Sequence, residues 1–167
     1  KSIFKLLVAA FLTVAPLTVI AQSNVAHINV QQLISEMPEV IAAQNELAKL
    51  EKDYTTQIDN AFKEFQTKAQ SYSSDAANQT DVTNQARQKE LESMQTNLQE
   101  FRDSAAQELQ KKQMDLMTPL LEKARNAITK VGEEQGFNYV IDSSPNGGII
   151  LANGKDLLAD VKKELGF

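Results

Sequence analysis

A long stretch without glycine or proline, residues 39–71, constrains the fold of this chain more than any other feature. Its apolar residues recur at a mean spacing of about 3.6 positions, which predicts an amphipathic helix and not a strand. Charged side chains occupy the opposite face, so the helix has one apolar stripe and is otherwise solvated. The stripe consists of Leu47, Leu50, Tyr54, Ile58, Ala61, Phe65, Ala69 and Tyr72.

A second apolar pattern of similar period follows the polar residues 71–81, which we expect to form a turn or a frayed tip. Pro119 lies inside this pattern and should kink or locally weaken the helix. A short connection makes successive helices antiparallel neighbours. The sequence therefore predicts a helical hairpin over residues 38–135, with its tip near residues 71–84. The second pattern consists of Leu91, Met94, Leu98, Phe101, Ala105, Leu109, Leu116, Leu120, Ala124, Ala127 and Val131.

Strand-like segments lie before and after the two helices. Residues 25–30 alternate between apolar and polar, which is typical of a half-buried strand. Residues 137–142 and 149–152 are predicted to be two further strands, joined by a turn over residues 143–148. Asp156 is expected to cap a last helix.

The strand-bearing part of the chain is too small to be complete in one copy. It comprises residues 22–37 and 136–167, a size at which one core is marginal without a disulfide or a metal. The chain has no cysteine and one histidine, so neither is expected. Short strands also leave open edges that can pair with another chain. We therefore predict a mainly α fold, in which the helical hairpin projects from a small β body that serves for oligomerisation.

The first 21 residues read as a secretory signal peptide. Lys1 and Lys5 flank the start of an apolar run that contains Pro16, and small residues precede a cleavage position after about Ala21. The run is shorter than the roughly 20 residues of a spanning helix, although an uncleaved membrane anchor stays open as an alternative. Without residues 1–21 the chain carries 15 basic and 22 acidic side chains. This acidic balance argues against nucleic acid as a partner.

No combination of residues points to catalysis. His27 stands alone on a strand, where we expect a polar strand position, and Asp142 has neither a histidine nor a placed second carboxylate beside it. Gly147 and Gly148 lie between two predicted strands, where a hairpin turn explains them better than a phosphate-binding loop. We therefore predict that the protein is not an enzyme, with no catalytic, cofactor-binding or metal-binding residues and no cofactor.

The order of these elements resembles that of the Skp/OmpH family of periplasmic chaperones. Residues 25–33 resemble the family's first strand and turn, residues 37–47 the start of its long helix, residues 137–142 its returning strand and residues 156–161 its closing helix. The resemblance covers essentially the whole chain after the signal segment.

The resemblance implies a homotrimer with a small β-barrel-like body and three coiled-coil arms around a cavity. Members of the family hold unfolded outer-membrane β-barrel proteins in the periplasm without ATP, so the implied partners are such proteins and further copies of this chain. The best-known members have basic arms, whereas residues 39–131 hold 12 basic and 15 acidic side chains here. For this reason, we do not extend to this chain the electrostatic capture of acidic clients by the arms.

A chaperone that only holds unfolded chains, called a holdase, needs a sheltered surface with some apolar area that binds many sequences weakly. Phe62 lies just off the main stripe, and Met94 has an adaptable side chain. We name Phe62, Tyr72 and Met94 as candidate client contacts. The competing interpretation is that the stripes form only the seam between the two helices. The residues expected in that seam are Leu47, Leu50, Leu98 and Leu109.

A second class of function also fits the pattern. The chain could be a structural coiled-coil protein of the envelope, whose helices dock to a fixed partner. A transient contact with a membrane surface also stays open. Promiscuity separates the two classes, because only a holdase keeps several unrelated unfolded proteins from aggregating.

Overall fold

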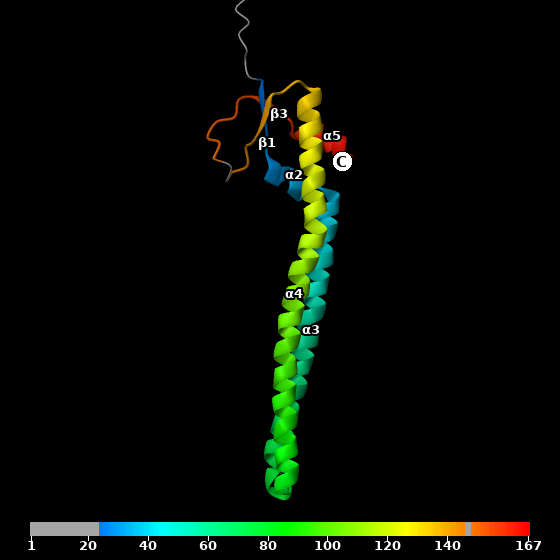
Figure 1. Ribbon diagram of the computed structural model, residues 1–167, viewed down its shortest axis with the longest axis vertical. Coiled ribbons are helices and arrows are strands. Elements are labelled where there is room, and N and C mark those ends of the chain that lie inside the picture. The colour runs from blue at the N-terminus through cyan, green and yellow to red at the C-terminus, as the bar shows by residue number, and fades with distance from the viewer. Residues whose placement is uncertain (1–23, 146–147) are drawn as a thin grey trace, which may run out of the picture.

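The computed structural model describes residues 24–145 and 148–167 (Figure 1). The signal peptide predicted for residues 1–21 lies outside the described residues. The elements, in chain order, are β1 (Val25–Ile28), α2 (Val30–Glu36), α3 (Pro38–Asp75), the 3₁₀ turn η1 (Ala76–Asn78), α4 (Asp81–Glu134), β2 (Tyr139–Asp142), β3 (Lys155–Asp156) and α5 (Leu158–Leu165).

The fold is mainly α with a small sheet, as the sequence predicts. α3 and α4 run side by side in opposite directions as one rod, and the strands, α2 and α5 gather at one end of it (Figure 1). α3 has 38 residues and α4 has 54. At about 1.5 Å per residue, α4 is on the order of 80 Å long. Pro38 occupies the start of α3, where its missing N–H costs nothing, and α4 continues through Pro119.

The turn between the long helices is shorter than the prediction of residues 71–81. α3 continues to Asp75, and α4 begins at Asp81, well before Leu91. The Thr80 hydroxyl accepts a hydrogen bond from the backbone N–H of Thr83 at 3.2 Å, which caps α4, and Asp81 follows in the first turn. These two residues are the helix-start signal that the apolar pattern does not contain.

The sheet has the order β2-β1-β3, and both outer strands are parallel to β1. Val25 pairs with Tyr139 and Ile28 with Asp142, while His27 lies opposite Asp156 on the other side. The strands that frame the two long helices are therefore direct neighbours in space.

The predicted hairpin of residues 137–142 with residues 149–152 is wrong. The third strand is β3, and residues 149–152 are not in a strand. After β2 the chain is tied to α2 instead of folding back, because the Ser144 hydroxyl accepts a hydrogen bond from the Gln31 N–H at 3.0 Å. Of the predicted turn, residues 146 and 147 lie outside the described residues. The expected cap of the last helix by Asp156 is wrong, because the N-cap of α5 is Leu157, without a side-chain cap hydrogen bond. Asp156 precedes this cap, and its Oδ1 accepts a hydrogen bond from the Leu158 N–H at 2.9 Å.

The core lies where the sheet meets the roots of the long helices. Ala26 and Ile28 of β1 point into it, and Leu33, Met37 and Val40 are fully buried beneath them. Apolar burial of this kind contributes about 25 cal/mol per Å², so this end of the molecule holds most of the stabilising surface. α4 and the C-terminal segment supply the other buried members, Ala124, Ala127, Val131, Leu157 and Val161.

Gly132 is required by the close approach of α4 to β2. A Cβ atom at this position would lie 2.8 Å from Cγ2 of Val140, and a valine side chain is too stiff to move aside cheaply.

We expect Gly132→Ala to lower the free energy of unfolding by about 1–3 kcal/mol through overpacking, although alanine is the better helix former. Chemical denaturation followed by circular dichroism measures this change. Adding Val140→Ala should recover part of the loss, because the two side chains then no longer compete for the same space. A Gly132→Ala variant as stable as the unsubstituted protein would show that α4 and β2 are not packed in this way.

Candidate functional site

The facing sides of α3 and α4 form an apolar seam. The rings of Tyr54 and Phe101 meet edge to face with 6.0 Å between their centroids, and Leu98 and Ala105 are buried between the helices. The residues expected in the seam are at least half-buried, namely Leu47, Leu50, Leu98 and Leu109. Most of the predicted stripe is therefore covered by the partner helix.

Ion pairs cross this seam near the body. Lys123 Nζ lies 2.5 Å from Glu39 Oε1, and Lys112 Nζ lies 2.7 Å from Glu46 Oε1. Half-exposed pairs of this kind contribute at most about 1 kcal/mol each, so they select the register of the helices more than they stabilise them.

Phe62 is the candidate contact residue that stays open to solvent. Its side chain is 39% exposed, and its ring stacks on that of Phe65 with 6.5 Å between centroids. The two rings border a shallow groove of about 460 Å³ that Leu98 and Arg102 of α4 also line. Met94 is half-buried on α4. Phe62 and its groove thus offer apolar surface on the arm that the seam does not cover.

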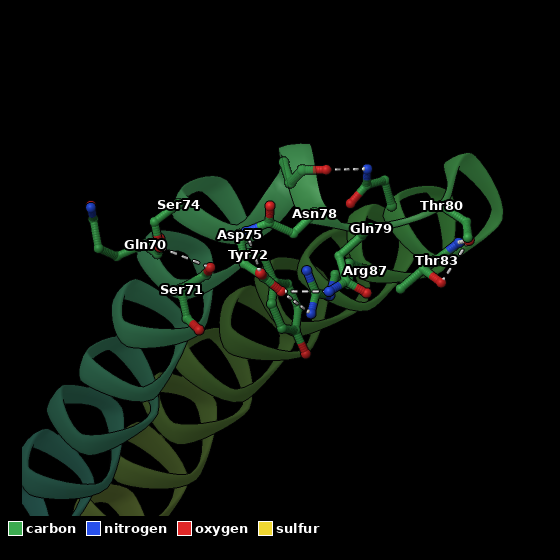
Figure 2. A network of polar contacts seen from close by, with 12 residues as sticks. Gln70, Ser71, Tyr72, Ser74, Asp75, Asn78, Gln79, Thr80, Thr83 and Arg87 are labelled. Carbon is green, nitrogen blue, oxygen red and sulfur yellow. Dashed lines mark hydrogen bonds and ion pairs between the residues drawn. The ribbon is translucent and has the colours of Figure 1, made fainter.

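Tyr72, the third candidate, is engaged within its own chain. Its hydroxyl donates to Glu90 Oε2 at 2.6 Å. The Arg87 guanidinium lies 4.6 Å from the ring centroid, and Figure 2 labels both of these side chains at the tip. Both its polar end and one ring face are occupied, so the structure does not place Tyr72 together with Phe62 on one free surface.

A polar network closes the tip of the rod around Tyr72 (Figure 2). Asp75 near the end of α3 accepts hydrogen bonds from Arg87 Nη2 at 3.1 Å and from Gln79 Nε2 at 2.8 Å. One turn further down, Lys68 Nζ lies 2.6 Å from Glu90 Oε1. Sequence reasoning missed this network, because the pairing of the two helices follows from the length of the turn and not from any local pattern.

These contacts shift the pKa values of the acids in one direction. The Lys68 ammonium and then the Tyr72 hydroxyl hold the pKa of Glu90 below its ordinary value, and the Arg87 guanidinium does the same to the pKa of Asp75. Reciprocally, the hydrogen bond to Glu90 raises the pKa of Tyr72. An acid whose pKa is lowered in the folded state stabilises that state above its unfolded pKa, and this contribution is lost as the pH falls through the folded pKa.

A second uncovered apolar surface lies at the root of the rod. A groove of about 880 Å³ runs between α2, α4 and β2, and Tyr139 at its border is 63% exposed. Its apolar lining includes Ile34, Leu121, Ile128, Phe137 and Val140. Sequence reasoning missed this groove, because its three walls come from distant parts of the chain.

The polar residues that the sequence analysis weighed for chemistry make structural contacts. Within them, no group of three or more histidine, cysteine, aspartate or glutamate side chains could hold a metal ion. His27 Nδ1 lies 3.1 Å from the Ser143 hydroxyl, a contact that joins β1 to the end of β2. Asp142 Oδ1 accepts hydrogen bonds from the Val30 and Ser144 N–H groups, so this side chain joins the end of β2 to the start of α2. None of the helices in the described part is long and apolar enough to cross a membrane.

Comparison with known proteins identifies the family of this chain. The model of the family described as outer membrane protein (OmpH-like) matches residues 24–165. The chain belongs to the OmpH-like family. This match confirms the resemblance drawn from the ends of the sequence, and it spans the rod, the sheet and α5.

OmpH-like relatives cover most of this chain at low identity. The protein is 26% identical over 148 residues to the chaperone protein Skp of Yersinia enterocolitica, a match that spans 86% of each chain. It is 21% identical over 151 residues to the chaperone protein Skp of Pectobacterium atrosepticum, which spans 90% of each. A solved OmpH-like structure from Caulobacter crescentus CB15 shares the fold, with a TM-score of 0.77, 12% identity and coverage of 87% of this chain and 85% of that one.

The tip network predicts an acid-sensitive arm. We expect the thermal unfolding midpoint to fall as the pH is lowered from 6 to 3, as Glu90 and Asp75 become protonated. Glu90→Gln should lower the midpoint at pH 6 and weaken its dependence on pH, because residue 90 no longer titrates. Circular dichroism melts at several pH values measure both effects. The matched control is Glu51→Gln on the exposed face of α3, and an equal response of the two variants would contradict the role given to Glu90.

Proposed function

We propose that this protein is an ATP-independent holdase chaperone of the periplasm, which binds unfolded outer-membrane proteins in a cavity between the helical arms of a homotrimer. Membership in the OmpH-like family supports this proposal, as does the name of its Skp relatives. The observation that carries it is the long rod of α3 and α4, anchored in a core at one end only (Figure 1). A rod anchored in this way can wall a cavity without filling it.

The trimer divides the chain into two working parts. Residues 22–37 and 136–167 form the oligomerisation body, and residues 38–135 form the arm. The small size of the body supports this division, because its core would gain apolar contacts from neighbouring copies. Three arms that leave one body in a common direction would enclose the client on several sides. Many weak contacts would then act together at high effective concentration.

Client contact on the arm rests on apolar surface more than on charge. Phe62 is the leading contact residue, Met94 adds a polarizable side chain, and Tyr72 contributes less because Glu90 and Arg87 hold it. Several of the arm's positive charges are paired with acids of the same arm. The matched cations are Lys68, Arg87, Lys112 and Lys123.

Aggregation assays test the proposed function directly. Several unrelated outer-membrane β-barrel proteins are diluted from urea with a stoichiometric amount of the protein and no nucleotide, and light scattering follows their aggregation. We expect all of them to stay in solution, with little loss of protection at raised salt because apolar contacts are not screened. Protection of a single client, or of none, would favour a structural coiled-coil protein with a fixed partner.

The same assay locates the contact surface. Phe62→Ser combined with Met94→Ser should weaken protection severalfold, while circular dichroism shows the helix content unchanged. The matched control combines Gln57→Ser with Gln107→Ser, which places two serines on exposed positions of the same two helices. If the Phe62 and Met94 variant protects clients as well as the control does, the arm contact surface lies elsewhere.

A further inference from the structure

We propose that Asn153 is a site of spontaneous covalent modification. The backbone nitrogen of Gly154 displaces the side-chain nitrogen of Asn153 as ammonia, and aspartyl and isoaspartyl residues are left at the entry to β3. The substrate is the chain itself and the co-reactant is water, so this inference is independent of the proposed function.

Asn153 lies where the backbone can reach the geometry of attack. Its side chain is exposed, and residues 148–154 form an irregular loop that contains neither helix nor strand. This loop projects from the sheet on the side away from α4 (Figure 1). Attack requires Cγ of asparagine to approach the nitrogen of the next residue, and a helix prevents this because its φ and ψ angles are fixed. The loop imposes no such constraint on Asn153.

Gly154 supplies the attacking nitrogen. Glycine has no Cβ, so its nitrogen is open to the preceding side chain. Among the described residues, no acceptor receives a hydrogen bond from the Gly154 N–H, whereas the Leu157 N–H donates to His27 O at 2.9 Å. A hydrogen bond protects an amide proton from solvent. The Gly154 proton lacks this protection in the described chain and is therefore accessible to base.

The other described asparagines lack one of these conditions. Some lie in the regular backbone of the long helices, namely Asn45, Asn60, Asn84, Asn97 and Asn126. Others precede valine, glutamine or tyrosine, whose side chains crowd the nitrogen, namely Asn24, Asn29, Asn78 and Asn138. Asn146 also precedes glycine but lies outside the described residues. Asparagine is among the thermolabile residue types, and within the described chain Asn153 combines exposure, a loop and a following glycine.

The reaction needs neither an oxidant nor a reductant. Base removes the amide proton of Gly154, and the nitrogen forms a bond to Cγ of Asn153. The bond from Cγ to the side-chain nitrogen breaks, and ammonia leaves with the proton that base removed, which gives a cyclic succinimide. Water then opens this ring. Opening at Cγ gives aspartate, whereas opening at the main-chain carbonyl carbon gives isoaspartate, in which the chain runs through Cβ and Cγ.

The isoaspartyl product acts on β3. It lengthens the main chain by a methylene group directly ahead of β3, and the two residues of this strand pair with β1. The chain lies close to β1 here, because a Cβ atom on Gly154 would lie 3.1 Å from Val25 O. After β3, Leu157 is fully buried, so the following segment cannot shift to absorb the added length. We expect β3 to separate from β1.

Ageing of the folded protein tests the site. The full chain is held in mildly alkaline buffer made with heavy-oxygen water, and peptide mapping by mass spectrometry follows each asparagine. We expect residue 153 of the folded protein to convert at a rate within severalfold of its rate in urea, with uptake of heavy oxygen. Asn126 on α4 is the internal control, and it should stay unchanged in the folded protein. Conversion of residue 153 in urea alone, or equal conversion of Asn126 in the folded protein, would overturn the proposal.

Thermal melts test the effect on β3. The isoaspartyl fraction of aged protein is identified with an isoaspartate-specific carboxyl methyltransferase and unfolded under circular dichroism. We expect its midpoint to lie several degrees below that of freshly prepared Asn153→Asp, which carries the same charge on an unaltered main chain. Asn153→Ser, aged alongside, should keep its midpoint because it cannot form the ring. Equal midpoints of the isoaspartyl fraction and Asn153→Asp, or an equal fall in aged Asn153→Ser, would refute the effect on β3.

Discussion

The parallel pairing of β1 with β2 is the interaction on which the rest of the structure depends. β1 precedes α3 and β2 follows α4, so their pairing obliges the chain between them to leave the body and to return to the same place. Closing so long a loop costs entropy, although this cost grows only slowly with length. The buried side chains of β1, α2 and the roots of α3 and α4 offset it, with Ile28, Leu33 and Val131 among them. The core that stabilises the protein is therefore also the base from which the arm projects.

Beyond that core, the arm is held by its own seam and by the polar network at its tip. The seam uses most of the apolar surface of the two helices, and the ion pairs that cross it use several of their charges. The apolar surface that remains open includes Phe62 with its shallow groove and the larger groove at the root. Ile41, Val82 and Met114 of the arm are also exposed, as separate side chains along the two helices. Apolar groups scattered in this way suit weak contacts with many sequences.

The sequence is informative wherever a local pattern decides the structure. The 3.6-residue period predicts both long helices, and Pro38 marks the start of α3. The missed features depend on distant contacts. The tip is shorter than its polar composition indicates, because the ion pair of Asp75 with Arg87 holds the last turn of α3 against the first turns of α4. Residues 149–152 have the composition of a strand but no partner within the described chain, and the root groove exists only after three separate segments meet.

In the described part of the chain, the outer edge of β2 has no neighbouring strand and lies beside an apolar groove, an incomplete sheet that favours the proposed association with further copies. This incompleteness links the fold to the proposed activity, because one arm cannot enclose a client whereas three can. The most direct measurement is the mass of the particle in solution, by light scattering after size separation over a wide range of concentrations. We expect three times the mass of one chain throughout that range. A constant mass of one chain, in a sample that still protects unfolded clients, would contradict it.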